Sequence, residues 1–298
     1  MKLISHYIEY QKKLYPDIVN WENHVINDDL FYSYRNTEYD RHTYPSALHY
    51  HDYYELVIFE GGDIQYICEG HVFCPKYGEI VLIPPGSFHM SAIKSEQTHY
   101  KRHVFYLYPS AFDDIGHGAL LSFLNSSKEG DILALNSLES VQALTDILRH
   151  LKEIFDPPTS PVEKALGFSY IIQLFYLLSQ KSCSSKSEST ILPQNLLTLQ
   201  QYINENFTEI SSVSQIAEHF FYSREYISRL FKKHFDTTIS DYILKRRVEK
   251  SRALILQGIP LIDISYQVGF GSLSSFIRAF KLVTGMTPSE YRKIWNEA

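Results

Sequence analysis

The chain has 298 residues, 44% of them hydrophobic, and a formal net charge of −6. This length allows two or three domains, and the hydrophobic content suits globular domains with a full core. The acidic net charge argues against a nucleic-acid partner for the chain as a whole. The balance is uneven, however, because residues 193–298 hold 13 Lys and Arg against 10 Asp and Glu, while residues 1–192 hold 15 against 24. A mildly basic tail behind an acidic front half is compatible with a polyanionic partner for the tail.

The sequence shows no sign of export or membrane insertion. The three cysteines, Cys68, Cys74 and Cys183, are too few and too scattered for a disulfide framework and suit a reducing compartment. We expect Cys68 and Cys74 to be small core residues. The N-terminal residues lack an apolar stretch of signal-peptide length, and the longest apolar run, at 170–178, is too short to span a bilayer. We therefore expect a cytoplasmic protein without a membrane partner.

Residues from about 30 to 110 form short runs rich in Tyr, Phe, Val and Ile that are separated by Gly and Pro. This pattern predicts an all-β barrel or sandwich, which we assign to residues 1–135. Glu60-Gly61-Gly62 and Glu69-Gly70 are predicted to be hairpin turns. The predicted strands lie within 30–36, 53–62, 63–70, 71–78, 79–86 and 99–108.

Three histidines and a glutamate are placed so that they can converge in this β domain. His49, His51 and Glu55 share one parity along an extended segment, and His89 follows a Pro-Pro-Gly turn that can bring it in from a neighbouring strand. The spacing resembles both motifs of the cupin barrel, although metal-binding cupins usually have Asn where this chain has Ile93. We favour hydrogen bonding of a polar effector such as a carbohydrate, with Tyr66 among the aromatic residues that suit a sugar face.

Two alternatives for these four side chains stay open. Three imidazoles and a carboxylate are ligands for a divalent metal such as Zn, Fe, Mn or Ni, so His49, His51, Glu55 and His89 are also candidate metal ligands. The other alternative is that the four side chains are structural remnants at the mouth of the barrel.

Residues 136–180 change to helical periodicity. Apolar residues recur every three or four positions from Leu138 to Phe155, and a second helix is predicted from Pro161 to about Gln180. The second helix is apolar on more than one face and therefore needs a partner on two sides. It is either sandwiched within its own subunit or part of a dimer interface, and we assign 136–180 as a helical dimerisation segment of a homodimer. The polar, Ser-rich residues 181–192 are predicted to be a flexible linker.

The tail, residues 193–298, contains an internal repeat. At an offset of 49, residues 229–242 match residues 278–291 in seven of fourteen columns by identity or by acid for acid, and Arg229 meets Arg278. Each copy is predicted to hold a short helix, a tight turn and a longer helix: 213–220 and 223–235 in the first, 261–268 and 272–284 in the second. Gly269 suits a turn at positive φ, and Ser223 and Ser272 suit helix N-caps. A connecting helix is predicted from Ser240 to about Gln257.

A helix pair of this kind is a helix-turn-helix, whose second helix can enter the major groove of DNA. A small helical bundle with surface Arg and Lys is the alternative, but the repeated pair with matched arginines favours DNA. On helical periodicity, we expect these side chains to face outward towards double-stranded DNA: Arg224, Glu225, Ser228, Arg229 and Lys232 in the first copy, and Ser274, Ser275 and Arg278 in the second.

The stretch from about Pro193 to Trp295 resembles the DNA-binding domain of AraC/XylS-type transcriptional regulators. IAEHFFYSREYISRLFKKHF (216–235) is similar to the family's first unit, and DISYQVGFGSLSSFIRAFKLVTGMTPSEYRK (263–293) to its signature across the second. The resemblance implies a cupin-like sensor domain for a small effector and RNA polymerase as a further partner. It also implies DNA contacts from Arg224, Glu225, Ser228 and Arg229 and from Ser272, Ser274, Ser275 and Arg278.

One departure from the family concerns the turn of the first unit, where Phe221 stands in place of the usual Gly. A bulky residue at positive φ is costly, so we expect this turn to be built differently or the first unit to sit at a changed angle. Arg278→Ala is then expected to weaken DNA binding more reliably than any single change in the first unit.

These observations predict an α+β, multidomain protein: a cupin-like β-barrel, a helical dimerisation segment, a linker and an all-α domain with two helix-turn-helix units. The predicted function is transcriptional regulation through sequence-specific DNA binding, controlled by an effector in the barrel. We expect no enzyme activity and no obligatory cofactor. The rivals are a metal-binding cupin enzyme with a DNA-binding tail, and an effector-free regulator whose barrel only dimerises.

Overall fold

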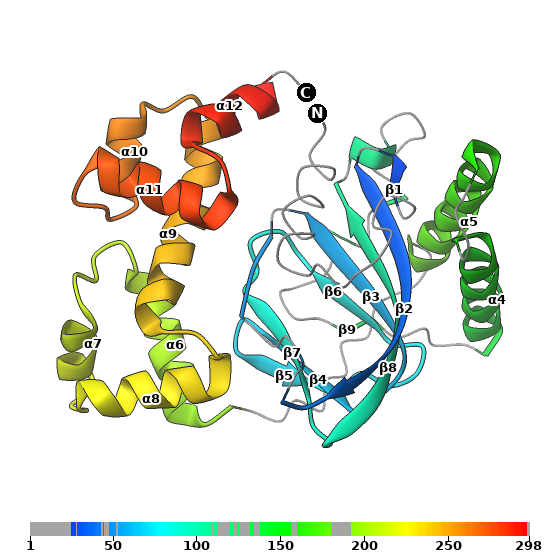
Figure 1. Cartoon of the computed structure of the whole chain (residues 1–298), viewed down its shortest axis with the longest axis horizontal. Helices are drawn as coiled ribbons and strands as arrows, with labels where there is room; N and C mark the ends of the chain where they lie inside the picture. The colour runs from blue at the N-terminus through cyan, green and yellow to red at the C-terminus, as the bar shows by residue number, and fades with distance from the viewer. Residues whose placement is uncertain are drawn as a thin grey trace. The chain divides into compact units, whose positions relative to one another are not determined.

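The computed structural model describes residues 25–27, 29–42, 44, 48–51, 53–108, 110–112, 120–121, 124, 132–133, 138–155, 160–179 and 192–296. The chain divides into two compact units, Met1–Thr190 and Ile191–Ala298, which we describe separately (Figure 1). Apart from Leu192, the predicted linker at 181–192 lies outside the described residues, as does Cys183.

The first unit is built on two antiparallel sheets. The strands of the larger sheet are, in spatial order, β1 (Val25–Asn27), β2 (Leu30–Asp40), β8 (Gln97–Leu107), β3 (Tyr54–Gly61), β6 (Ile80–Ile83) and β9 (Ile132–Leu133). Those of the smaller sheet are β5 (His71–Phe73), β4 (Ile64–Cys68) and β7 (His89–Ile93). Every predicted strand run contains an observed strand, whereas β1, β7 and β9 were not predicted.

The side chains of the larger sheet alternate between two cores. On one face, side chains such as Val57, Val81 and Tyr100 pack against Tyr66 and Ile93 of the smaller sheet, so the two sheets enclose an interior core. The other face belongs to a second core that is shared with two helices. Alternation along a strand is what sends successive side chains to these opposite faces. We call the side of the larger sheet that faces the smaller sheet the inner face.

One of the two predicted hairpin turns is confirmed and the other is wrong. Cys68 pairs with His71 across Glu69-Gly70, and both turn residues have positive φ (44° and 87°), as a two-residue type I′ hairpin requires. Residues 60–62 also form a turn, but the strands on its two sides lie in different sheets, so it is a corner between sheets.

The two cysteines differ from each other in burial. Cys68 is buried as expected, whereas the expectation for Cys74 is wrong because its side chain is exposed beyond the end of β5.

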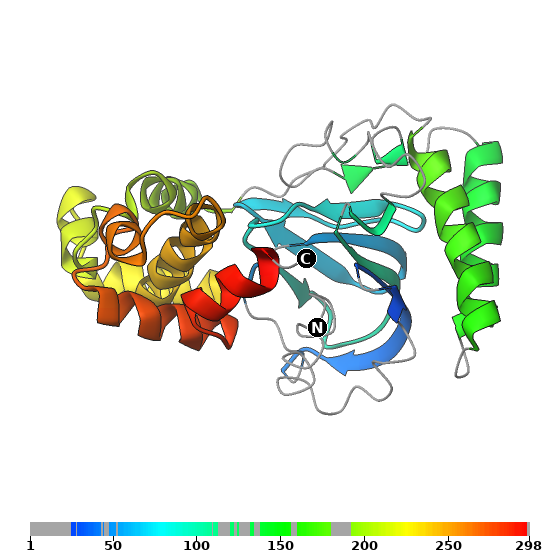
Figure 2. The same cartoon turned by 90° about the horizontal axis from the view of Figure 1, so that it is seen from above.

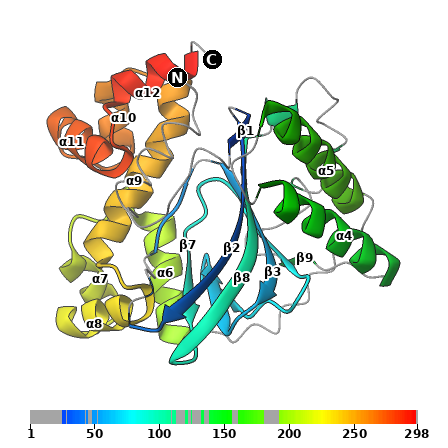
Figure 3. The same cartoon turned by 45° about the vertical axis from the view of Figure 1, so that its right-hand side comes forward.

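Helices α4 (Leu138–Phe155) and α5 (Pro161–Ser179) confirm both predicted helices and lie side by side over the outer face of the larger sheet (Figures 2 and 3). Gly167 of α5 permits this pairing, because a β-carbon there would lie 2.5 Å from Cζ of Phe155. The buried stripe of α5 consists of Gly167, Ile171, Leu174, Phe175 and Leu178. A second face of α5 leaves Val162, Leu166 and Tyr176 exposed.

All regular secondary structure in the described part of the second unit is helical. Its helices are α6 (Gln194–Asn206), α7 (Val213–His219), α8 (Arg224–Phe235), α9 (Ile239–Leu256), α10 (Leu261–Gln267), α11 (Leu273–Thr284) and α12 (Pro288–Asn296). The predicted boundaries of α7 to α11 are correct to within one residue, and α6 and α12 were not predicted. Helix α9 contributes Val248 and Ile255 to a core with α10, α11 and α12.

The two helix pairs, α7 with α8 and α10 with α11, have the same turn. Phe221 adopts φ 56° and Gly269 adopts φ 89°. The main-chain hydrogen bonds correspond: Tyr222 N donates to Ala217 O over 2.9 Å, and Phe270 N donates to Ser265 O over 2.8 Å. The expectation that the first turn is built differently is therefore wrong. Phe221 accepts the left-handed conformation, and its side chain is 95% exposed.

Most of the matched columns of the repeat hold residues that cap a helix or pack in the core. Thr238 caps α9 by accepting from Asp241 N, and Thr287 and Glu290 form the reciprocal hydrogen bonds of a capping box before α12. Tyr242 and Tyr291 are buried, as are Phe231 and Phe280. The matched arginines and lysines are not accounted for in this way.

Two other arginines stabilise the scaffold. Arg247 of α9 donates from Nε and Nη2 to the carbonyls of Phe207 and Ile210, at and just beyond the end of α6. Arg292 of α12 makes the same kind of contact with the carbonyls of Ile255 and Ile259 at the end of α9. Each arginine thereby donates to main-chain carbonyls at or just beyond a helix end.

Candidate functional site

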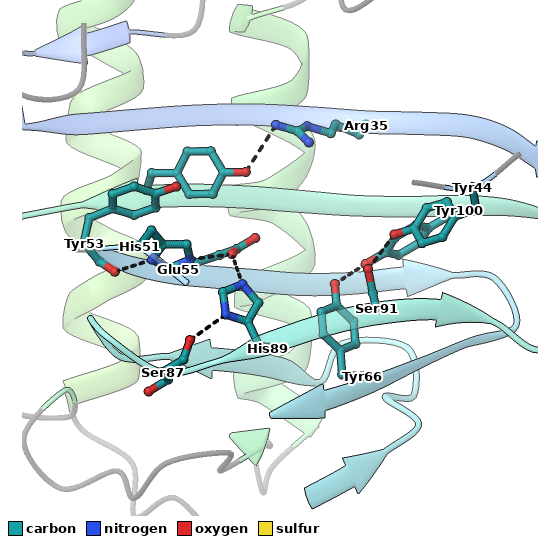
Figure 4. A network of polar contacts seen from close by, with 11 residues as sticks. Arg35, Tyr44, His51, Tyr53, Glu55, Tyr66, Ser87, His89, Ser91 and Tyr100 are labelled. Atoms are coloured by element: carbon teal, nitrogen blue, oxygen red, sulfur yellow. Dashed lines mark hydrogen bonds and ion pairs between the residues drawn. The ribbon is translucent and has the colours of Figure 1, made fainter. Parts of the chain in front are cut away.

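The structure brings the predicted histidines and glutamate together between the two sheets, and we call His49, His51, Glu55 and His89 the histidine cluster. Figure 4 shows three of its members, His51, Glu55 and His89. His49 and His89 exchange both main-chain hydrogen bonds of an isolated antiparallel bridge. Glu55 lies near the start of β3, and His89 begins β7. His51 and His89 are buried, Glu55 is mostly buried and His49 is exposed.

Main-chain carbonyls fix the orientation of the two buried imidazoles. Nδ1 of His51 lies 2.8 Å from Tyr53 O, and Nδ1 of His89 lies 2.9 Å from Ser87 O, so each Nδ1–H donates to a carbonyl. The Nε2 atoms then face the carboxylate of Glu55, at 2.9 Å from His51 and 3.2 Å from His89. Each Nε2 either carries a proton shared with the carboxylate or directs a lone pair to the same point as the carboxylate.

Burial and hydrogen bonding shift the two ionisation equilibria in this cluster. Burial lowers the pKa of His51, and the hydrogen bond with Glu55 only partly offsets that effect. Burial raises the pKa of Glu55, but the contacts with His51 and His89 outweigh it and hold the pKa well below its ordinary value. Glu55 is therefore an anionic acceptor at neutral pH.

The donor set fits a divalent metal ion as well as a polar ligand. One ligand atom each from His49, Glu55 and His89 lies within 4.8 Å of the others. Imidazoles held through Nδ1 by carbonyls are typical of metal-binding histidines, and two imidazoles with a carboxylate suit Zn, Fe or Mn. His51 hydrogen-bonds the same carboxylate. Both predicted uses of the cluster are therefore compatible with its geometry.

Tyr66, the remaining predicted effector residue, points into the interior core from β4 and belongs to a group of tyrosines. Its hydroxyl hydrogen-bonds that of Tyr100, and the hydroxyl of Tyr44 lies 2.5 Å from Ser91 Oγ (Figure 4). We call Tyr39, Tyr44, Tyr66 and Tyr100 the tyrosine cluster. Tyr53 is not part of this cluster. Its ring stacks on the imidazole of His51 at a centroid distance of 4.0 Å and so supports that side chain.

Arg102, which is buried beside the tyrosine cluster, was not among the predicted site residues. Its guanidinium carbon lies 3.8 Å from the centroid of the Tyr100 ring. A signal was present in the sequence, because Arg102 shares the parity of Tyr100 and Val104 along β8, and those positions face the interior.

The predicted DNA-contacting residues of the first helix pair lie on α8. Arg224, Glu225, Arg229 and Lys232 are exposed, and Ser228 is half-buried. Ser223 caps the helix by accepting from Tyr226 N. No ion pair or hydrogen bond of Arg224 or Arg229 occurs among the described residues.

The corresponding residues of the second pair lie on and before α11. Ser274 and Arg278 are exposed, whereas Ser272 and Ser275 are half-buried. Ser272 caps α11 by accepting from Ser275 N over 3.2 Å, and its hydroxyl also contacts those of Ser274 and Ser275. Arg278 has no hydrogen-bonding or ion-pairing partner in the part of the chain that the structure describes. Arg229 and Arg278 thus occupy equivalent exposed places in equivalent helices.

Within the described residues, no helix combines the length and apolar character that crossing a membrane requires.

Comparison with known protein families gives matches to both units. A model of the AraC-like ligand-binding domain matches residues 33–175, and a model of a helix-turn-helix domain matches residues 216–294. The HTH-type transcriptional activator AarP of Providencia stuartii is 32% identical over 106 residues, which are 35% of this chain and 76% of AarP.

Two further relatives extend into the first unit or name a regulated operon. The HTH-type transcriptional activator RhaS of Enterobacter sp. (strain 638) is 24% identical over 251 residues, 82% of this chain and 87% of RhaS. The raffinose operon transcriptional regulatory protein of Pediococcus pentosaceus is 27% identical over 148 residues. That match covers 49% of this chain and 53% of the regulator.

Proposed function

Since the chain belongs to the AraC family of transcriptional regulators, with a ligand-binding domain and a helix-turn-helix domain, we propose that it is a one-component switch. In this proposal a small effector binds between the sheets of the first unit. The α7–α8 and α10–α11 pairs act as two helix-turn-helix units on DNA. Effector binding changes, through the predicted linker at 181–192, which DNA half-sites a dimer can reach.

The observation that carries the DNA-binding proposal is the pair Arg229 and Arg278. The matched Thr, acidic, Phe and Tyr columns of the repeat supply core packing or helix caps, whereas these two arginines are exposed and have no partner among the described residues. Arginine can pair bidentately with guanine in the major groove. Helix α9 has 18 residues and is therefore about 27 Å long, a suitable spacer for two helices placed about one DNA turn apart.

The test of this proposal measures affinity for a DNA site that the full-length protein selects from a random pool. Arg229→Ala and Arg278→Ala are each expected to weaken binding by about 5- to 150-fold, which corresponds to about 1–3 kcal/mol for a lost base contact. The two turns have the same backbone geometry, so we expect losses of similar size. Lys101→Ala, an exposed change on β8, is the charge-matched control. If all three variants bind like wild type, the proposal fails.

For the effector we propose a carbohydrate that hydrogen-bonds the histidine cluster and the hydroxyl of Tyr66. Aromatic rings with polar tips suit sugar faces, and one relative is named as a regulator of a raffinose operon. A thermal-shift screen of the full chain against sugars, raffinose included, is the test. We expect at least one sugar to raise the unfolding midpoint of wild type but not of Tyr66→Phe or His49→Ala. A screen without any such sugar would contradict the carbohydrate proposal.

The proposed dimer uses the outward face of α5. One stripe of this helix is buried in its own subunit, while Val162, Leu166 and Tyr176 are 78%, 49% and 61% exposed. Leu166→Glu with Tyr176→Glu should convert a dimer to a monomer in analytical ultracentrifugation, whereas exposed Glu163→Gln should not. A wild-type protein that is monomeric at micromolar concentration would refute this assignment.

A metal-binding cupin enzyme is the second candidate, and the convergence of His49, Glu55 and His89 favours it. Those residues would hold the ion, which would act as a Lewis acid on a bound substrate. Metal analysis of the purified chain separates the candidates. Stoichiometric iron or manganese that is lost on His49→Ala/His51→Ala supports the enzyme, and substoichiometric metal in both proteins argues against it.

A further inference from the structure

Arg102 is buried in the interior of the first unit. It is 7% exposed, and it shares the inner face of β8 with Tyr100. Its guanidinium stacks on the ring of Tyr100, and its positive charge helps to lower the pKa of Tyr39. Within the described residues no acid forms an ion pair with it, and its Nη1 has no hydrogen-bond partner.

The surroundings of Arg102 add positive charge instead of neutralising it. On the neighbouring strand, Arg35 stands directly opposite Arg102 in the antiparallel register. Arg35 also belongs to the inner-face parity of β2, where its guanidinium donates to Ser33 Oγ and to the hydroxyl of Tyr106. Like charges directly opposite each other destabilise a sheet. The nearby carboxylate of Glu55 contacts His51 and His89 instead.

Two arginines placed opposite each other, one of them buried, destabilise the fold unless an anion binds beside them. A buried charge without a counter-ion is strongly destabilising, and an arginine remains protonated under all ordinary conditions. The hydroxyls of the tyrosine cluster are additional donors on the same side. Burial raises the pKa of Tyr66 and Tyr100, so both phenols stay protonated at neutral pH.

We propose that Arg102 is the counter-ion for an anionic group of the effector, a carboxylate or a phosphate, which the tyrosine cluster flanks with hydroxyl donors. This inference rests on the proposed effector function of the first unit and specifies its ligand. In this proposal the rest of the effector extends towards the histidine cluster. An acidic sugar or a sugar phosphate has the required chemistry, and a neutral sugar lacks it.

The test uses the full-length chain at constant ionic strength, with chloride, acetate, inorganic phosphate, D-glucose, D-glucuronate and D-glucose 6-phosphate as probes. Unfolding midpoints and apparent affinities are measured for wild type, Arg102→Met and Lys101→Met. Methionine keeps the unbranched stem of the side chain without the charged guanidinium, and Lys101→Met removes an exposed charge next to it. Arg102→Lys, which keeps the charge, is the second variant if Arg102→Met does not fold.

At least one anionic probe should raise the midpoint of wild type and of Lys101→Met, with binding weakened about tenfold or more in Arg102→Met. Glucose should show no difference between the proteins. Stabilisation by carboxylates alone identifies a carboxylic acid, and stabilisation by phosphates alone identifies a phosphorylated ligand. The inference is overturned if no anion gives an Arg102-dependent shift, or if glucose alone binds all three proteins equally.

The two proposals can fail separately. If an anion binds in a way that depends on Arg102 but leaves the affinity for DNA unchanged, the anion site is supported and its role as an effector site is refuted. If a neutral sugar changes the affinity for DNA equally in wild type and Arg102→Met, the proposed regulator function is supported and the anion site is refuted.

Discussion

Replacing Gly269 by alanine should destabilise the second unit through two separate costs. The residue adopts φ 89°, a conformation that costs an L side chain roughly 1–2 kcal/mol. An alanine β-carbon would also lie 2.9 Å from Cα of Thr208, and closer still to the carbonyl oxygen of that residue. This clash is with main chain, so no side-chain rotation relieves it, and overpacking of this kind costs about 1–3 kcal/mol more.

Two other glycines in the same unit separate these costs. Gly258 has φ 79° with open space where a β-carbon would lie, so Gly258→Ala should lose only the conformational part, about 1–2 kcal/mol. Gly271 has neither positive φ nor a close neighbour, so Gly271→Ala should be nearly neutral. Gly269→Ala should lose roughly 2–5 kcal/mol in total. Chemical denaturation of the full chain, followed by the helical circular dichroism signal, measures all three. A Gly269→Ala variant no less stable than Gly258→Ala would refute the predicted clash with Thr208.

Three further predictions concern single side chains. Phe221→Gly should stabilise the second unit by about 1 kcal/mol and so raise its thermal midpoint, because the backbone of Phe221 has φ 56° and its ring is exposed. A lowered midpoint would reveal a contact that the ring makes. Arg247→Ala should destabilise the second unit by roughly 2–4 kcal/mol through two lost carbonyl contacts, with Arg247→Lys recovering only part, and equal stability of all three proteins in denaturant would contradict this. His103 contacts Tyr32 and Glu60, and burial lowers its pKa. As the pH falls, His103 is therefore protonated in the unfolded chain before it is protonated in the folded chain. The folded state keeps its full stability above about pH 6.5 and loses stability as the pH falls below that value. As the pH falls below about 6.5, wild type should lose up to about 1.4 kcal/mol of stability per pH unit more than His103→Gln, and parallel pH profiles of the free energy of unfolding would exclude the effect.

The helical unit was largely predictable because its signals are local. Caps such as Ser223 and Ser272 and the repeat offset placed five helices to within a residue. Phe221 was misjudged because sequence reasoning assigns a steric cost to positive φ but cannot see that the same turn hydrogen bonds form regardless. Helices α6 and α12 were not predicted because they lie outside the two repeated helix pairs.

The interior site was only half predictable. The spacing of His49, His51 and Glu55 identified one cluster because those residues are close in sequence. Arg102 is linked to Tyr39 and Tyr66 only through strand pairing across the fold, which no local pattern reports. Likewise, the corner at residues 60–62 looked like a hairpin because turn residues do not reveal which sheet the next strand joins.

The equivalence of α8 and α11 as DNA-reading helices is tested by comparing the DNA sequences that wild type, Arg229→Ala and Arg278→Ala select. Wild type should select a motif with two blocks about one helical turn, roughly 10 base pairs, apart. Arg229→Ala should lose base preference in one block, and Arg278→Ala in the other. Identical motifs from all three proteins, or no motif from wild type, would contradict the assignment of α8 and α11 as recognition helices.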